Sequence, residues 1–409
     1  MTGTQPRRAF VLVIDACGAG ALPDAADYGD EGTCTLTNVA AMHGGLELPV
    51  LGALGLGSIV AIEGVPPPRE GAGAIHGRLA PLGPGKDSIT GHWELMGVTL
   101  PAALPTYPDG FPPALVARLE AATGHRLICN RADDGLSAIE EFGAEHLSSG
   151  GLILYTSQDS VLQLAGHNAV LTADELYDAC RRAREAMAGP NAVGRVIARP
   201  FEGQPGCFAR THGRRDFSLA PPGGSYLREL AAAGSSVIGV GKIEDLFAGR
   251  GLTASHPGAT NAEALDAVAH LADELDGDPP ALVFANLIET DQLYGHRKDV
   301  AGFAAALAEI DARVGELLGE LREGDLLVLT ADHGVDPAHP GTDHTREHAP
   351  LLAVTGEMAG RAAKGGGYGG FRHDGPMADV GATVLWWLAG AQDERLPGSP
   401  FLPPRAGGG

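Results

Sequence analysis

Three apolar segments of this chain run into aspartate residues, and this pattern restricts the possible folds more than any other feature. The segments are 10–14, 281–288 and 326–330, and the acids are Asp15, Asp291 and Asp332. Continuous apolar, β-branched runs of this length are typical of strands buried on both faces of a parallel sheet. In open α/β sheets, ligands bind beyond the carboxyl ends of the strands. We therefore expect the three acids to meet at one edge of one sheet.

Amphipathic segments separate these predicted strands. Apolar residues recur at alternating steps of four and three from Phe303 to Leu321, which predicts a helix between the second and third strands. A second helical pattern covers 261–276, directly before the second strand. Strands that alternate with helices in this way indicate the α/β class, with a mostly parallel sheet flanked by helices.

The chain of 409 residues is long enough for more than one domain. Proline-rich stretches at 101–113 and 221–224 are typical of domain crossings. They predict a core formed by 1–101 and 222–409 and an inserted smaller domain at 102–221. Within the insertion, helical patterns at 114–122 and 172–188 alternate with apolar strands at 152–155 and 195–198, so we expect a second α/β unit.

The composition restricts the possible partners. A formal charge of −22 argues against binding to nucleic acid or an anionic membrane, because no positive field would attract a polyanion. No apolar stretch is long enough to span a membrane, and the run at 9–14 is too short for a secretory signal. The five widely spaced cysteines predict free, buried thiols. We expect a soluble, cytoplasmic protein.

Carboxylates and imidazoles follow the predicted strands from separate parts of the sequence. Their side chains are the ligands that hard and borderline divalent cations prefer. Singly, Asp15 also fits a turn or helix cap, and His296 also fits a surface position. Together they predict a metal site at the strand ends, with these candidate ligands: Asp15, Asp291, His296, Asp332, His333 and His344.

The segment Gly85–Glu94 offers a nucleophile. Ser88 or Thr90 would serve if a metal lowered the pKa of its hydroxyl, and the alternative is that one of them caps a helix. The segment is not a phosphate-binding P-loop, because Asp87 and Ala80 stand where that motif requires Ser or Thr and Gly. The segment His344–His348 has the spelling of an inverted zinc protease motif, but nearby prolines make the required helix improbable.

Several long motifs, in order along nearly the whole chain, resemble the phosphopentomutase family of the alkaline phosphatase superfamily. The matching stretches are Ile14-Asp15 with Gly18, Pro23–Ala25, Gly85–Glu94, Tyr155–Ser157, Asp159–Gln163, Gly194–Phe201, Gly241–Ile243, Gly295–Arg297 and Asp332–Glu347. The resemblance implies an alkaline-phosphatase-like core with an inserted cap. It also implies interconversion of ribose 1-phosphate and ribose 5-phosphate, or of the deoxyribose equivalents.

The resemblance further implies a two-metal site, with manganese as the ion. One ion would be held by Asp15, Ser88, Asp332 and His333, and the other by Asp291, His296 and His344. Ser88 would carry the phosphate, primed by a sugar bisphosphate such as glucose 1,6-bisphosphate. The family usually has threonine there, but serine keeps the hydroxyl. The sugar phosphate would contact four residues of the insertion: Ser157, Asp159, Arg195 and Arg210.

Three departures from the family pattern stand out: Ala16 in place of serine, Glu289 in place of aspartate, and the segment Arg131–Leu136. The last lies in the insertion and bears on sugar specificity. Alternatives remain open. The same metals and Ser88 suit a phosphatase or phosphodiesterase, a cofactor-independent phosphoglycerate mutase has the same core arrangement, and a metal-binding protein without turnover is a further alternative.

Overall fold

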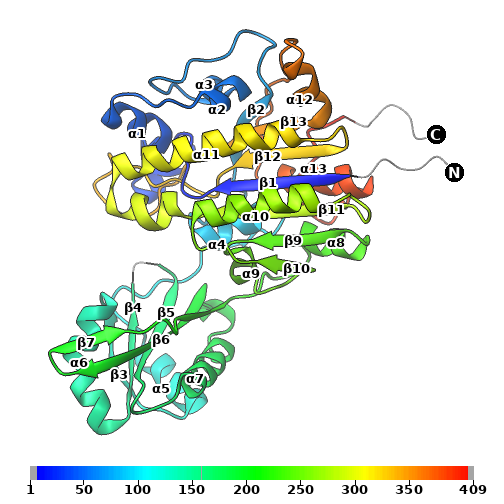
Figure 1. Cartoon of the computed structure of the whole chain (residues 1–409). Helices are drawn as coiled ribbons and strands as arrows, with labels where there is room; N and C mark the ends of the chain where they lie inside the picture. The colour runs from blue at the N-terminus through cyan, green and yellow to red at the C-terminus, as the bar shows by residue number, and fades with distance from the viewer. Residues whose placement is uncertain (1–6, 158, 404–409) are drawn as a thin grey trace. The chain divides into compact units, whose positions relative to one another are not determined.

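The computed structural model describes residues 7–157 and 159–403, and the chain forms two compact units. The larger unit comprises Met1–Ala102 and Pro221–Gly409, and the smaller unit is the intervening segment Ala103–Ala220. Each unit has its own sheet and its own helices (Figure 1).

An eight-stranded sheet forms the centre of the larger unit, in the order β10-β9-β11-β1-β12-β13-β2-β14. The five strands from β10 to β12 are parallel to their neighbours, whereas β13 runs antiparallel to both β12 and β2. The strands are β1 Arg8–Ile14, β2 Ile75–Ala80, β9 Ser236–Val240, β10 Ala254–His256, β11 Ala281–Leu287, β12 Asp325–Thr330, β13 Ala349–Thr355 and β14 Gly375–Pro376.

The three predicted strands with terminal acids are the three adjacent strands β11, β1 and β12, and every residue in them is buried. Their parallel register pairs Ile14 with Leu287 and Val13 with Thr330. The segments that follow these strands therefore leave the sheet side by side, at the same edge.

Helices cover both faces of this sheet. In Figure 1, α10 (Asn261–Glu274) and α11 (Val300–Glu320) lie in front of it, and α4 (Ser88–Leu95) and α13 (Asp379–Ala389) lie behind. The predicted periodicity is confirmed, because α11 buries Phe303, Leu307, Ile310, Val314 and Leu317. The remaining helices are α1 Thr35–His43, α2 Pro49–Leu54, α3 Leu56–Ile59, α8 Tyr226–Ala232, α9 Ile243–Leu246 and α12 Gly356–Ala363.

The smaller unit has a six-stranded sheet, in which five strands follow the order β3-β4-β5-β6-β7 and the sixth, β8, pairs with β6. Apolar clusters lie on its two faces, one beneath α5 and α7 and one beneath α6. The elements are α5 Pro113–Thr123, β3 Leu127–Ala132, α6 Gly135–Ser149, β4 Leu152–Thr156, β5 Val161–His167, α7 Ala173–Ala186, β6 Arg195–Gln204, β7 Cys207–Arg210 and β8 Arg215–Ser218.

The predicted α/β class is confirmed, with a mostly parallel sheet flanked by helices. All five cysteines are free, as expected. The expected burial is confirmed for Cys17 and Cys180, but Cys34 and Cys129 are only half-buried. Cys207 is exposed because it lies on the short strand β7 at the border of the smaller sheet. Among the described residues, no helix combines the length and apolar character needed to cross a membrane.

Candidate metal centre and nucleophile

The three strand-end carboxylates lie together in the larger unit. Asp15 directly follows β1, Asp332 lies just beyond β12, and Asp291 lies in a π-helical turn, Thr290–Tyr294, that follows β11. The Ala16 N–H donates to Asp332 Oδ1 at 3.1 Å, and the Thr290 hydroxyl donates to the Asp15 carbonyl at 2.6 Å. These contacts join the three loops.

Each of these carboxylates leaves one oxygen without a hydrogen bond. Asp15 Oδ1, Asp291 Oδ1 and Asp332 Oδ2 are buried and have no hydrogen-bond partner among the described residues. Burial of an unpaired carboxylate oxygen is costly unless a cation or donor compensates it. Three such oxygens in one place therefore fit divalent cations.

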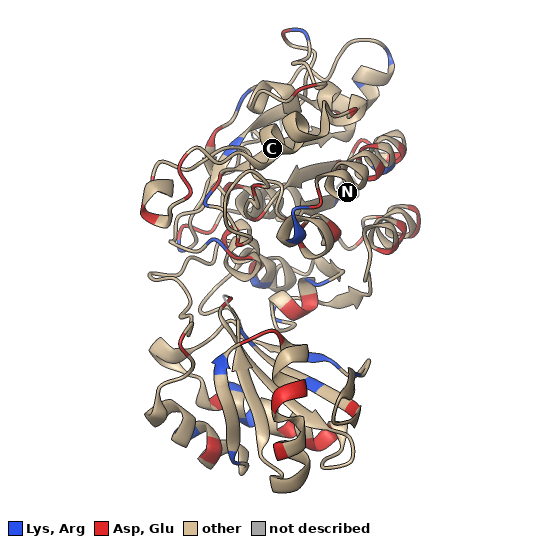
Figure 2. Cartoon of the chain, turned by 90° about the vertical axis from the view of Figure 1, so that its left-hand side faces the viewer, with Lys and Arg blue, Asp and Glu red and all other residues tan. Residues whose placement is uncertain are grey.

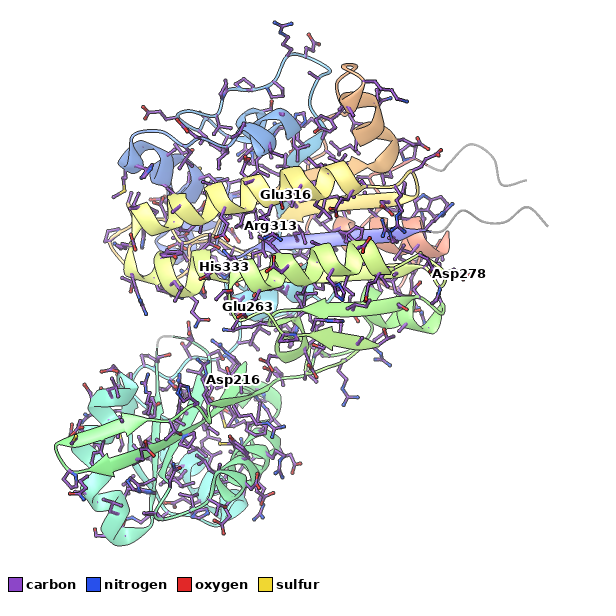
Figure 3. The ribbon with its side chains drawn as sticks, in the orientation of Figure 1. Asp216, Glu263, Asp278, Arg313, Glu316 and His333 are labelled. Carbon is purple, nitrogen blue, oxygen red and sulfur yellow. The ribbon has the colours of Figure 1, made fainter. Side chains whose placement is uncertain are left out.

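Imidazole nitrogens surround the same oxygens. Asp15 and Asp332 form one group with His333, and Asp291 forms a second with His333 and His344; the donor atoms of each group lie within 4.8 Å of one another. His296, at the rim, completes the second group, because its Nε2 is 3.3 Å from Asp291 Oδ1 and 3.2 Å from His344 Nε2. The structure thus brings together all six candidate ligands. His333 is labelled in Figure 3, at the end of β1.

The electrostatics of the cluster are those of crowded buried acids. Burial and the negative charges of Asp332 and Asp291 raise the pKa of Asp15 well above its ordinary value. Burial also acts to raise the pKa of Asp291, but the hydrogen bond and charge of His344 and the charge of His296 lower it to about 2. Burial lowers the pKa of His333, so its neutral form, which can bind a metal, is favoured.

Ser88 lies at the first position of α4, and its Oγ is 3.0 Å from His333 Nε2. It does not cap the helix. Asp87 is the N-cap and accepts from the N–H groups of Ile89 and Thr90, while the Thr90 side chain returns a bond to the Asp87 backbone. The expected helix cap is therefore confirmed for Thr90, which forms a capping box with Asp87, and is wrong for Ser88. Because the N–H groups of Ile89 and Thr90 already donate to Asp87, they do not also bind a phosphate on Ser88. The positive charge that such a phosphate needs must come from other groups.

Two candidate functional residues, His92 and Asn286, were not predicted from the sequence. Asn286 donates from Nδ2 to Asp15 Oδ2 at 2.8 Å and also lies 3.2 Å from His92 Nε2. His92 Nδ1 is 2.8 Å from the Ser88 carbonyl and 3.2 Å from Asp332 Oδ2. Since a carbonyl only accepts and the amide donates, His92 carries its proton on Nδ1. A hydrogen-bonded chain thus connects Asp15 with Ser88.

The loops around the centre are fixed by buried charged residues. Glu347 accepts from the Thr35 N–H at 2.9 Å and from the hydroxyls of Thr35 and Thr345. Arg346 donates to the Gly85 carbonyl at 2.6 Å and forms an ion pair with Asp24. These bonds hold the segment before Ser88 against the segment that contains His344.

The segment His344–His348 contains no helix, as expected, and His348 Nδ1 faces the Gly20 carbonyl at 3.1 Å.

Two of the departures from the family pattern, Ala16 and Glu289, lie in the larger unit. Ala16 has a left-handed φ of 61°. Glu289 accepts from the Asn261 N–H at 2.7 Å and donates its own N–H to the Asn261 side chain at 3.1 Å.

The predicted substrate residues lie at two places in the smaller unit. Arg195 is 3.5 Å from Asp159 and 3.7 Å from Asp216, and Ser157 lies in the loop just after β4. Arg210 is paired with Phe201, six positions farther along β6 than Arg195, and its guanidinium is 3.8 Å from Asp134. Arg195 and Asp159 are therefore in contact, whereas Arg210 is not adjacent to them. Arg131, the first residue of the third segment that departs from the family pattern, forms ion pairs with Asp133 and Glu141.

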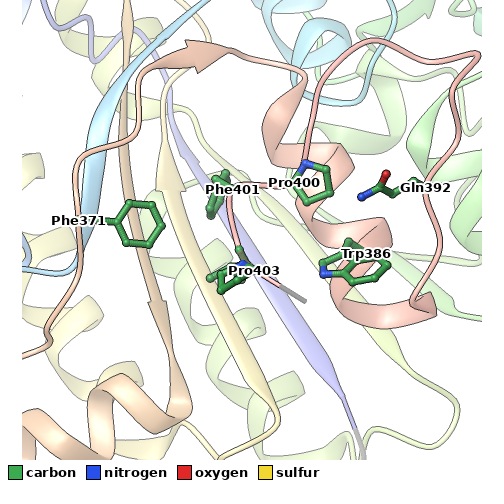
Figure 4. Close-up of a pocket in the computed structure, with 7 residues that line it drawn as sticks. Phe371, Trp386, Gln392, Pro400, Phe401 and Pro403 are labelled. Carbon is green, nitrogen blue, oxygen red and sulfur yellow. The ribbon is translucent and has the colours of Figure 1, made fainter. Parts of the chain in front are cut away.

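A separate pocket of about 510 Å³ opens near the end of the described chain (Figure 4). Phe371, Trp386 and Phe401 are among its lining side chains, and none of the lining residues is charged. Such a lining does not suit a phosphate ester, so the centre at the strand ends is the candidate site.

Comparison with known proteins agrees with this geometry. The model of the metalloenzyme superfamily matches residues 7–389. The chain is 50% identical to the phosphopentomutase of Anaeromyxobacter dehalogenans strain 2CP-1, over 95% of this chain and 97% of the relative. The chain belongs to the phosphopentomutase family. It is therefore an enzyme, an intramolecular phosphotransferase of the isomerase class.

Other similarities extend over most of the chain. The chain is 47% identical to the phosphopentomutase of Herpetosiphon aurantiacus, over 86% of this chain and 89% of the relative. A solved structure of Leishmania mexicana phosphoglycerate mutase aligns over 98% of both chains with 12% identity and a TM-score of 0.49.

Proposed function

We propose that this protein is a phosphopentomutase that interconverts ribose 1-phosphate and ribose 5-phosphate, and the 2-deoxyribose equivalents. It would act in the cytoplasm, in nucleoside and pentose phosphate metabolism. The family membership supports this assignment, and one observation of the site carries the chemistry. The Ser88 hydroxyl adjoins His333, the imidazole common to both groups of metal-ligand candidates.

Two divalent metal ions, most consistent with Mn²⁺, are the proposed cofactors. Asp15, Ser88, Asp332 and His333 would hold one, and Asp291, His296 and His344 would hold the other. The three orphaned carboxylate oxygens support this fit. When bound, such a pair of ions offsets the negative charge on the attacking and leaving oxygens of a phosphoryl transfer.

Ser88 is the proposed phosphate carrier. In the forward step, the bond between Ser88 Oγ and phosphorus breaks, a bond between the sugar hydroxyl oxygen and phosphorus forms, and the hydroxyl proton ends on Ser88. The resulting sugar bisphosphate then returns its other phosphate to Ser88 with the reverse proton movement. The net change is isomerisation, and a bisphosphate such as glucose 1,6-bisphosphate would prime the first cycle.

The smaller unit is proposed to bind the sugar phosphate, and the larger unit to bind the metals. Arg195 and Arg210 would bind phosphate oxygens, because a planar guanidinium suits a phosphate dianion. Asp159 would accept hydrogen bonds from sugar hydroxyls, with Ser157 beside it. The contact between Arg195 and Asp159 supports their joint role.

One assay tests the proposal against its main alternatives. Manganese-loaded protein is incubated with ribose 1-phosphate and catalytic glucose 1,6-bisphosphate, and the products are followed by phosphorus NMR. Ribose 5-phosphate is the expected product. Inorganic phosphate as the main product would favour a phosphatase, and turnover of 3-phosphoglycerate with none of ribose 1-phosphate would favour a phosphoglycerate mutase.

A further inference from the structure

Tyr155, on β4 of the smaller unit, is fully buried, yet its hydroxyl has no hydrogen-bond partner among the described residues. An unpaired buried hydroxyl costs free energy that phenylalanine at this position would avoid. Burial raises the pKa of the Tyr155 phenol, and the positive charges of Arg199, Arg210 and Arg214 oppose that rise. The hydroxyl therefore faces a concentration of positive charge.

Arg199, on β6, is an arginine without an ion-pair partner among the described residues. Its Nε donates to the neutral amide oxygen of Gln163 at 3.0 Å, and no carboxylate of the described residues forms an ion pair with it. Burial lowers the pKa of its guanidinium, and the charge of Arg214 lowers that pKa further. A half-buried arginine beside other arginines is costly unless an anion joins them.

The nearby acids are already engaged. Asp216, labelled in Figure 3, accepts two bonds of 2.8 Å from Arg214 and lies 3.7 Å from Arg195. Asp134 caps α6 by accepting from the N–H groups of Leu136 and Ser137. Figure 2 shows blue and red segments interspersed over the smaller unit, with blue on several of its strands. The charge of Asp216 raises the pKa of Arg199, but burial and the neighbouring arginines outweigh that effect, so the pKa of Arg199 remains lowered.

The geometry places these groups on one face of the smaller sheet. Residues alternate between faces along a strand, so Arg195, Arg199 and Phe201 of β6 share a face, and Arg210 is paired with Phe201. A Cβ at Gly135 would overlap both the Tyr155 hydroxyl and the Arg210 guanidinium. These two polar groups thus meet over Gly135, and along β6 Arg199 lies between Arg195 and Phe201, the partner of Arg210 on β7.

We propose that Tyr155, Arg199 and Arg210 form an anion-binding pocket for a phosphate monoester, specifically the phosphate of the sugar phosphate that is not being transferred. The pocket rests on the proposed function and adds Tyr155 and Arg199 to its substrate contacts. Arg199 supplies its outer nitrogens, Arg210 a second guanidinium, and Tyr155 a neutral donor. Bound phosphate would provide both the missing acceptor for the hydroxyl and the missing charge for Arg199.

The test is a calorimetric titration of ribose 5-phosphate into manganese-loaded protein that carries Ser88→Ala, so that no transfer to residue 88 occurs. In this background, Arg199→Gln is expected to raise Kd by at least about tenfold, and Tyr155→Phe by about threefold. Arg126→Gln is the matched control, because the Arg126 side chain is 69% exposed and its guanidinium lies 3.8 Å from Glu145. It is expected to leave Kd unchanged.

A second measurement separates binding from folding. Because Tyr155→Phe removes an unpaired hydroxyl, its Tm without ligand is expected to equal or exceed that of the parent. Unchanged Kd in both Tyr155→Phe and Arg199→Gln would overturn the proposal. If Arg199→Gln fails to fold, Tyr155→Phe and Arg199→Lys decide in the same way, with weaker binding in both supporting the pocket.

The pocket and the proposed function fail in different ways. Mutase turnover by the unmodified protein, together with unchanged Kd in the variants, would remove the pocket and leave the function. Weaker binding in the variants, in a protein that shows no mutase turnover, would keep the pocket and remove the function. Absence of ribose 5-phosphate binding by the parent would remove the pocket.

Discussion

Ser88 Oγ lies 3.0 Å from His333 Nε2, and the same nitrogen lies 3.4 Å from Asp15 Oδ1 and 3.3 Å from Asp332 Oδ2. One imidazole nitrogen therefore joins the end of β1, the end of β12 and the start of α4. A hydroxyl held beside buried, unpaired carboxylate oxygens is positioned to become a nucleophile when cations occupy the centre.

Replacing Asp291 should separate the two metal positions. We expect the unmodified protein to retain two manganese ions per chain after dialysis, and Asp291→Asn to retain about one, because the first group of ligands does not include Asp291. Inductively coupled plasma mass spectrometry measures the content. Asp266→Asn is the control, since this exposed acid of α10 forms its one ion pair among the described residues with Arg313. Two tightly held ions in Asp291→Asn would contradict the assignment.

The buried chain through His92 should orient Ser88. His92→Phe keeps a ring in a fully buried site but leaves the Ser88 carbonyl without its donor. We expect kcat to fall about 10- to 100-fold with little change in KM, as for other residues that orient ligands. Nitrogen NMR of the unmodified protein should show the proton of His92 on Nδ1. A proton on Nε2, or an unaltered kcat, is incompatible with this role.

Gly91 should be required for the close approach of α4 to the end of β12. A Cβ there would lie 2.7 Å from Asp332 Cβ and would overlap the Asp332 carbonyl. Gly91→Ala is expected to lower the free energy of unfolding by about 1–3 kcal/mol. Gly319→Ala is the matched control, because a Cβ at Gly319 in α11 meets no atom of the described residues within 4 Å. That variant should be as stable as the parent or about 0.4–1 kcal/mol more stable in urea titrations.

His146 should make the smaller unit sensitive to acid. Its Nδ1 faces the Gly151 carbonyl at 2.7 Å, and its Nε2 accepts from the His167 N–H at 2.8 Å, so only the neutral ring fits. Burial accordingly lowers the pKa of His146 below its ordinary value of 6.5. The unfolded chain then binds the extra proton first as pH falls. This contribution to stability is complete above pH 6.5 and decreases below it, by up to about 1.4 kcal/mol per pH unit.

Hydrogen exchange of α6 between pH 7.5 and pH 5 measures this effect, after correction for the intrinsic exchange rate. Protection of the helix should decrease with acid in the parent. His146→Gln has no ionisable ring and should lose most of that dependence. Equal acid sensitivity in both proteins would assign the effect to other groups.

Much of the larger unit was predictable because its central strands are uniform. Strands β1, β11 and β12 are buried on both faces, so their apolar runs indicated their position, and the parallel register then brought their acids together. The antiparallel strands were not predicted. Burial alternates along β2, and β13 contains Pro350, so neither has a clear pattern of a central strand.

The supporting residues of the site left weaker signals. Asn286 interrupts an otherwise apolar buried strand, and a buried amide requires a partner, so the sequence contained one usable indication. His92 follows Ser88 by four residues and so shares its face of a helix, but only the fold brings it to Asp332 and Asn286. Such contacts between distant segments depend on the packing of α4 against the sheet.

The central claim is that Ser88 carries the phosphate between the two positions of the sugar. Manganese-loaded protein is incubated with glucose 1,6-bisphosphate, quenched, digested and examined by peptide mass spectrometry, with Ser88→Ala treated in parallel. We predict phosphate on Ser88 in the parent, and a loss of mutase turnover of at least about a thousandfold in Ser88→Ala. An unphosphorylated Ser88 together with a fully active Ser88→Ala variant would contradict the account.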